Sequence, residues 1–167
     1  NINLLQPNGQ FGTRMQGGDD SASERYIFTQ LNPLTRAIFP DLDDPILNYL
    51  NEDGHAIEPE YYVPILPMAL VNGIAGIGTG FSTTIPPFHP KKLIEYIQAR
   101  LRGDPNPPVE FVPHYENFKG HIQSIDGEAN KFLIKGAYTR VDDDKIRITE
   151  LPIGTWTMPY VTFLEGL

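Results

Sequence analysis

The sequence contains no cysteine, which excludes disulfide bonds, thiolate metal sites and cysteine nucleophiles. Basic residues are scarce: 13 Lys and Arg stand against 21 Asp and Glu, giving a formal net charge of -8. A chain with this balance lacks a general electrostatic footprint for nucleic acid, so an anionic partner has to be held by a few local cations. No apolar run approaches the roughly 18 residues of a membrane span, and we expect no membrane partner.

Metal ligands are also poorly arranged. The four histidines include no pair at i and i+4, the spacing that presents two imidazoles from one helix face to a zinc ion. Asp41, Asp43 and Asp44 are only loosely similar to an acidic metal loop, and we interpret them as a solvated turn after Pro40. We therefore expect no metal site within this chain.

What the sequence does contain is enough apolar material for folded structure. Hydrophobic residues make up 40% and aromatic residues 11% of the chain, too much for a disordered tail. The first residues, Asn1 to Pro7, read like the interior of a domain, and the last ones directly follow an amphipathic stretch. We expect both ends to be cuts within a longer protein.

Periodicity predicts two lobes with different structure. Pro90 opens the clearest helix, whose apolar residues recur at helical spacing to Leu101 before Gly103 ends it. Four prolines within residues 104–113 predict a linker. Beyond the linker, alternating apolar residues predict strands at Phe118 to Ile125, Lys131 to Tyr138 and Lys145 to Leu151.

Several local features carry weaker expectations. Asn8-Gly9 is a tight-turn signal that predicts a hairpin or a wing-like loop. Residues 46–50 fit one helical turn, and residues 56–72, apolar but cut by prolines, fit an irregular, extended and buried segment. Thr155 fits the cap of a last helix.

Tyr26 has a chemical possibility that its neighbours strengthen. A tyrosine hydroxyl can attack phosphorus, but with an ordinary pKa of about 10 it needs a base or a nearby cation at neutral pH. Arg25 is adjacent, and Arg14 can fold back through a glycine turn, so guanidinium groups are available for a phosphate whose charge builds up. Taken alone, this signal is weak, because a tyrosine is far more often a packing residue than a nucleophile.

The glycines around Ile77 do not form a nucleotide-binding motif. No G-x-x-x-x-G-K-[ST] run is present, and Gly73 to Gly80 never gives G-x-G-x-x-G in register. Without further context, Ile77 is interpreted as a core side chain.

Motifs along the whole chain resemble the type IIA DNA topoisomerases, specifically the eukaryotic topoisomerase II branch. The tyrosine region carries Gln10-Phe11-Gly12-Thr13-Arg14, Gly17-Gly18, Ser21-Ala22-Ser23 and Arg25-Tyr26-Ile27-Phe28-Thr29. Further stretches agree in order and spacing: Glu58-Pro59-Glu60-Tyr61-Tyr62, Pro64-Ile65-Leu66-Pro67-Met68, Gly76-Ile77-Gly78-Thr79-Gly80, Phe118-Lys119-Gly120, and Ile148-Thr149-Glu150-Leu151-Pro152 with Thr155-Trp156-Thr157.

The resemblance implies an enzyme that cuts both strands of one duplex, passes a second duplex through the break and reseals it. It makes Tyr26 the nucleophile that becomes linked to the 5′ phosphate, with Arg25 as the cation beside the scissile phosphate. It makes Ile77 the residue that wedges between base pairs. The DNA contacts that it implies in this chain are Arg14, Gln16, Ile77, Gly78 and Thr79.

The resemblance also implies a domain plan and an assembly. We expect an α+β chain in which residues 1–115 form the later part of a winged-helix domain and residues 116–167 begin a mixed α/β tower domain, both truncated. Mg²⁺ and ATP would serve the full enzyme from sites outside this chain. The expected partners are double-stranded DNA and a second copy in a homodimer, and the expected location is the nucleus, or the host cell for a viral protein.

Some positions depart from the family pattern. Asp19 stands where a lysine is common, and Glu24 stands before Arg25 where proline or alanine is usual, so both oppose positive charge near DNA. Two alternatives therefore stay open beside the topoisomerase II interpretation. One is a bacterial gyrase-like breakage subunit, and the other is a DNA-binding module without catalytic activity.

Overall fold

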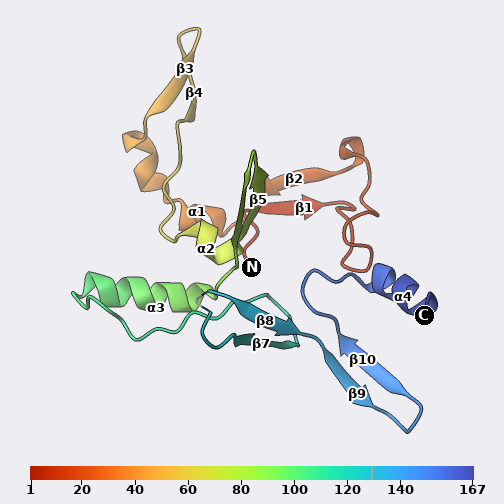
Figure 1. Ribbon diagram of the computed structural model, residues 1–167. Helices are drawn as coiled ribbons and strands as arrows, with labels where there is room; N and C mark the ends of the chain where they lie inside the picture. Colours follow the sequence, from red (N-terminus) through yellow and green to blue (C-terminus); the bar gives the residue numbers. More distant parts are fainter. Residues whose placement is uncertain (129) are drawn as a thin grey trace. The chain divides into compact units, whose positions relative to one another are not determined.

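The computed structural model describes residues 1–128 and 130–167 and has an α+β architecture (Figure 1). Its described strands form five two-stranded sheets, each made by one pair of strands. The α+β class predicted from the sequence is confirmed. Within the described residues, no helix is both long enough and apolar enough to cross a membrane.

Contacts divide the chain into two compact units. The first contains Asn1, Pro7–Thr29 and Glu110–Leu167, and the second contains Ile2–Gln6 and Gln30–Val109. Strands β1 (Leu5–Asn8) and β2 (Phe28–Leu31) pair with each other, and both pass from one unit into the other. The tyrosine region is therefore grouped with the C-terminal part of the chain. The division into winged-helix and tower domains near residue 115 stays a prediction.

The second unit holds most of the helices. Its elements are α1 (Thr35–Ile38), the 3₁₀ helix η2 (Asp41–Ile46), β3 (Tyr49–Glu52), β4 (His55–Pro59), α2 (Met68–Asn72), β5 (Ile74–Gly78), β6 (Phe81–Ile85) and α3 (Pro90–Leu101). The predicted helix at Pro90 is confirmed. The His89 imidazole Nδ1 accepts a hydrogen bond from the Lys91 amide at 3.1 Å, and proline occupies the first turn.

Burial in the second unit is concentrated on few side chains. Ile38, Val71 and Leu93 are the buried hydrophobic residues of the described chain, with Val71 fully enclosed. The expectation of a buried, extended segment at residues 56–72 is wrong in part. β4 is a strand paired with β3 and is exposed except for its last residue, Pro59. α2 begins directly after Pro67, a position just outside the helix where the missing amide proton of proline costs no helical hydrogen bond.

Residues 46–50 are also not a helical turn as expected. The 3₁₀ helix ends at Ile46, and the chain becomes strand β3 from Tyr49 onward. The preceding aspartates lie in η2, where Asp41 and Asp44 form ion pairs with Arg36 at 3.0 and 3.1 Å.

The first unit is built largely from hairpins. It contains the 3₁₀ helix η1 (Glu24–Tyr26), β7 (His121–Ser124), β8 (Phe132–Lys135), β9 (Ala137–Arg140), β10 (Ile146–Glu150) and α4 (Thr157–Glu165). β7 pairs with β8 and β9 with β10, both antiparallel. The predicted segment Lys131 to Tyr138 is divided into two strands at Gly136, where a Cβ atom would collide with the Glu150 carbonyl oxygen.

Two local predictions in the first unit have different outcomes. The expected hairpin or wing-like loop at Asn8-Gly9 is the long connection of residues 9–27 between the paired strands β1 and β2. The expected cap by Thr155 is wrong: the residue before α4 is Trp156, which makes no side-chain capping hydrogen bond. The chain there contacts distant residues, since the Met158 amide donates to the Met15 carbonyl oxygen.

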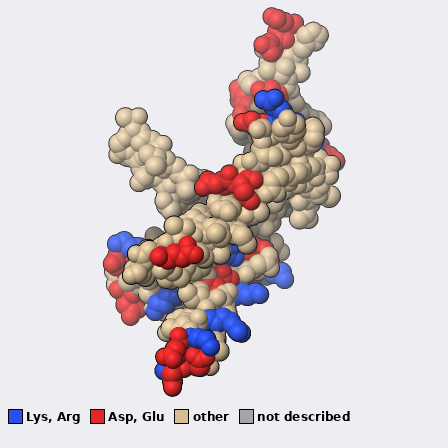
Figure 2. All heavy atoms as spheres, turned by 90° about the vertical axis from the view of Figure 1, so that its right-hand side faces the viewer, with Lys and Arg blue, Asp and Glu red and all other residues tan. Residues whose placement is uncertain are grey.

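Charged side chains on the β9–β10 hairpin neutralise one another. On the face drawn in Figure 2, Lys and Arg atoms lie among Asp and Glu atoms at the lower end of the view, where this hairpin turns. Arg140 pairs with Asp143 at 2.7 Å and Lys145 with Asp142 at 3.3 Å. The hairpin tip therefore offers no uniform cationic patch for a phosphate backbone.

Candidate functional site

Tyr26 is presented to solvent at the end of a short helical turn. It is the last residue of η1, its amide donates to the Ser23 carbonyl oxygen at 2.9 Å, and its side chain is 67% exposed. The guanidinium carbon of Arg25 lies 5.9 Å from the centre of the Tyr26 ring, within cation–π range. Tyr26 is therefore accessible to a large substrate, and a permanent positive charge accompanies its ring.

The loop before η1 is closed on itself by glycines and by Asp20. A Cβ atom on Gly12 would come within 2.6 Å of the Gly18 Cα, so only glycine permits this crossing. The Asp20 carboxylate accepts hydrogen bonds from the Thr13 amide at 2.8 Å, the Thr13 hydroxyl at 2.9 Å and the Gln10 side-chain amide at 3.1 Å. These bonds, above all the one from the Thr13 amide, hold the pKa of Asp20 below its ordinary value.

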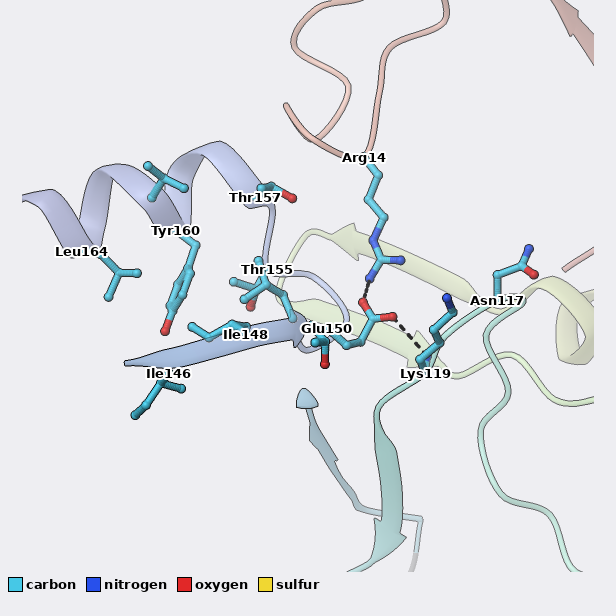
Figure 3. A pocket seen from close by; sticks show the side chains of 13 residues that line it. Arg14, Asn117, Lys119, Ile146, Ile148, Glu150, Thr155, Thr157, Tyr160 and Leu164 are labelled. Atoms are coloured by element: carbon cyan, nitrogen blue, oxygen red, sulfur yellow. Dashed lines mark hydrogen bonds and ion pairs between the residues drawn. The ribbon is translucent and has the colours of Figure 1, made fainter. Parts of the chain in front are cut away.

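Arg14 projects from this loop into an ion pair with Glu150 (Figure 3). The Glu150 side chain is only 9% exposed, whereas that of Arg14 is 50% exposed. The second Glu150 carboxylate oxygen accepts from the Lys119 amide at 3.1 Å. These residues line an open cavity of about 740 Å³ together with residues of β10 and α4.

Two further contacts fix the same loop to the segment that follows β10. The indole of Trp156 lies against Gly17, where a Cβ atom would be 2.5 Å from the ring carbon Cδ1. The Met158 amide donates to the Met15 carbonyl oxygen at 3.0 Å. The sequence places Glu150 and Trp156 in family motifs but gives no signal that they contact this loop.

Ile77 is not a core residue. It lies near the tip of the β5–β6 hairpin, opposite Ser82, and is 94% exposed. The next pair is Gly78 with Phe81, so Thr79 and Gly80 form the two-residue turn, and Gly80 has a φ of +77° that favours glycine. An isoleucine held out from a narrow hairpin with glycines on either side is suited to insertion into a partner.

The predicted site residues are thus divided between the two units. Arg14, Gln16, Arg25 and Tyr26 belong to the first unit. The hairpin residues Ile77, Gly78 and Thr79 belong to the second. Gln16 is half-buried in the glycine loop, and both departures from the family pattern, Asp19 and Glu24, are exposed. In the part of the chain that the structure describes, no group of three carboxylate or imidazole ligands is placed to hold a metal ion.

Comparison with known proteins gives consistent matches over the entire sequence. The family model that describes the A subunit of DNA gyrase/topoisomerase IV matches residues 1–167. The chain is 52% identical over its full length to DNA topoisomerase 2 of Arabidopsis thaliana and 53% identical to DNA topoisomerase 2 top-2 of Caenorhabditis elegans. It covers only 11% of each of those proteins.

A solved structure shares the fold. The crystal structure of the Plasmodium falciparum topoisomerase II DNA-binding, cleavage and re-ligation domain superposes with a TM-score of 0.90 and 48% sequence identity. The match covers 100% of this chain and 22% of that one.

Proposed function

Because the chain belongs to the DNA gyrase/topoisomerase IV family and is similar to eukaryotic DNA topoisomerase 2, we propose that it is the tyrosine-bearing part of an ATP-dependent type II DNA topoisomerase. The enzyme makes a transient double-strand break, passes a second duplex through it and reseals the break. The observation that carries this proposal is the exposed Tyr26 with the Arg25 guanidinium over its ring, in a chain about half identical to those enzymes.

In the proposed reaction Tyr26 exchanges one phosphate ester for another. The phenol loses its proton as its oxygen attacks the phosphorus, and the bond from phosphorus to the 3′ oxygen breaks. The 3′ oxygen takes up a proton, and the 5′ phosphate stays on Tyr26 as a phosphotyrosyl ester. The reverse reaction reseals the strand without an external energy source, because the ester bond is conserved.

Arg25 is suited to stabilise this exchange. Negative charge builds up on the phosphate oxygens in the transition state, and a guanidinium next to the attacking phenol is always charged and donates in a planar fork. Glu24 works in the opposite direction, since it adds an exposed carboxylate to the same helical turn. We propose that this weakens phosphate affinity without changing the nucleophile.

The β5–β6 hairpin is the proposed wedge. An apolar side chain that enters a base step unstacks it at a cost of a few kcal/mol, which the contacts to bent DNA repay. The 94% exposure of Ile77 supports this role. The backbone at Gly78 and Thr79 is proposed to approach the duplex, together with Gln16 and the half-exposed Arg14 from the glycine loop.

The rest of the proposed assembly lies outside this sequence. We propose that Mg²⁺ and ATP bind other parts of a longer polypeptide, because the chain covers only 11% of the relatives named DNA topoisomerase 2. We further propose a homodimer acting on double-stranded DNA in the nucleus, with residues 1–115 in a winged-helix domain and residues 116–167 opening a tower domain. The similarity to proteins named DNA topoisomerase 2 supports these assignments.

The test is covalent trapping with the full-length enzyme that contains this segment. The enzyme is incubated with DNA labelled internally, just 3′ of a cleavage site, and the reaction is stopped with detergent. We expect labelled protein from the wild type and none from Tyr26→Phe, which keeps the ring and removes only the attacking oxygen.

The two alternatives predict other results. A wild-type enzyme that binds DNA but forms no adduct would support a catalytically inactive DNA-binding module. A gyrase-like breakage subunit would give the adduct only when a separate ATPase subunit is added. The eukaryotic relatives favour the single-polypeptide arrangement.

A further inference from the structure

We propose that Glu150 and Trp156 are positioning residues for Tyr26, holding the glycine loop that precedes the tyrosine in a cleavage-competent place. This proposal rests on the proposed function, because it concerns the same reaction. It gives the segment after β10 a part in catalysis although no residue there contacts the reacting atoms. It also gives Arg14 a role that does not depend on touching DNA.

Three contacts from residues 150–158 converge on three of the four loop residues 14 to 17. The Glu150 carboxylate forms an ion pair with the guanidinium of Arg14. The Met158 amide donates to the carbonyl oxygen of Met15, and the Trp156 indole lies against Gly17. Figure 3 shows Arg14 pointing from its loop to Glu150, with Lys119 on the other carboxylate oxygen. An ion pair, a backbone hydrogen bond and a close ring contact thus restrain both the backbone and the side chains of the loop.

The restraint extends to Tyr26 through the rest of the loop. Asp20 holds Thr13, and the Ala22 amide donates to the Gln10 carbonyl oxygen at 2.9 Å, so the two arms of the loop are tied together. At its start the loop reaches the tyrosine itself: a Cβ atom on Gly9 would be 3.3 Å from the Tyr26 carbonyl oxygen. A shift of the loop is therefore transmitted to the backbone that carries the nucleophile.

Glu150 is well suited to this role because it is nearly buried. A carboxylate with 9% exposure is stable only when its charge is compensated, and Arg14 and the Lys119 amide provide that compensation. An exposed pair would be weakened by solvent and salt. Small displacements matter for this chemistry, since a misplacement of about 1 Å can slow a reaction by about 10²-fold.

The test uses the full-length enzyme with Glu150→Gln, Arg14→Gln, the double variant, and the exchanged pair Arg14→Glu with Glu150→Arg. Glutamine keeps an oxygen for the Lys119 amide and loses only the charge. Two quantities are measured for each protein: the rate of covalent complex formation at saturating DNA, and the salt dependence of DNA affinity. Asp142→Asn is the matched control, because it removes a carboxylate from an exposed ion pair on the hairpin tip of the same unit.

We expect Glu150→Gln to slow covalent complex formation about tenfold or more with an unchanged salt slope, and the control to react like the wild type. The effects of the two single variants should not add, and the exchanged pair should recover part of the rate. The proposal is overturned if Glu150→Gln cleaves at the wild-type rate while Arg14→Gln lowers the salt slope by about 0.9, the signature of one lost phosphate contact. It is also overturned if Glu150→Gln lowers the affinity for DNA and leaves the rate of covalent complex formation unchanged.

A second variant covers the case in which the charge change disturbs folding. Trp156→Phe keeps an aromatic ring but withdraws the indole edge from Gly17, and we expect slower cleavage with normal DNA affinity. If Trp156→Phe forms the covalent complex at the wild-type rate, the proposed positioning role of Trp156 is overturned. Failure of the proposed function is distinguishable from these outcomes, because it would leave the wild-type enzyme without any adduct.

Discussion

The guanidinium of Arg14 and the carboxylate of Glu150 form an ion pair across a separation of 136 residues in the chain. The pair lies within one compact unit, and it joins the loop before Tyr26 to the end of strand β10. The Arg14 side chain is thus half-exposed to solvent, while its guanidinium group is bound to the nearly buried carboxylate of Glu150.

Gly17→Ala should loosen the glycine loop. The added methyl group would collide with the Trp156 indole, and the backbone φ of +68° is strained for alanine. Because both effects destabilise the folded loop, we expect its free energy of unfolding to fall by about 2–3 kcal/mol. Amide hydrogen exchange at residues 9–27 of the full-length enzyme measures this destabilisation and should become faster. Gly18→Ala is the control in the same loop: its φ is +93° but its Cβ meets no atom, so about 1 kcal/mol is expected. Equal destabilisation by Gly17→Ala and Gly18→Ala would show that the contact with the Trp156 indole is not the cause.

Asp20 should make the stability of the loop dependent on pH. Its pKa in the folded chain lies below the ordinary 3.8, because the Thr13 amide donates to the carboxylate. The stabilisation is fully present above pH 3.8 and is lost as the pH falls through the folded value. The thermal midpoint of the wild type should therefore exceed that of Asp20→Asn near neutral pH, and the difference should shrink in acid. A difference that is constant with pH would contradict this assignment.

Ile77→Ala should leave stability nearly unchanged and alter DNA geometry. The side chain is 94% exposed, so little apolar burial is lost, while the wedge that unstacks a base step becomes too short. DNA bending, measured by energy transfer between dyes on the duplex ends, should fall, and cleavage sites should shift. Val71→Ala is the opposite control: it opens a fully buried position and should cost about 2 kcal/mol. Normal bending in Ile77→Ala would exclude the wedge.

Arg25→Gln should slow cleavage by about 10²-fold at saturating DNA, since it removes a charge proposed to act in the transition state. Arg25→Lys should recover part of the rate, because it keeps the charge without the planar fork. Single-turnover cleavage measures both. Lys131→Gln removes a cation from an exposed ion pair with Glu128 and should have no effect. An equal loss in Arg25→Gln and Lys131→Gln, with Arg25→Lys reacting like the wild type, would indicate a general effect of net charge and contradict a local role of Arg25.

Local signals in the sequence predicted the local elements well. The helix at Pro90 and the strand-rich C-terminal part were expected because helical spacing and strand alternation act over a few neighbouring positions. Predictions failed where distant residues decided the outcome. Thr155 does not cap α4, and the second predicted strand divides at Gly136 because the Glu150 carbonyl oxygen approaches it.

The sequence by itself determined the α+β class, the family membership and the identity of the proposed nucleophile and its neighbouring cation, Tyr26 and Arg25, since motif residues and periodicity are written along the chain. Only the tertiary structure decided that Ile77 is held in solvent, that Trp156 rests on Gly17 and that Glu150 binds Arg14. Contacts of this kind join residues more than 130 positions apart, and their energies depend on burial and close approach, which exist only once the chain has folded.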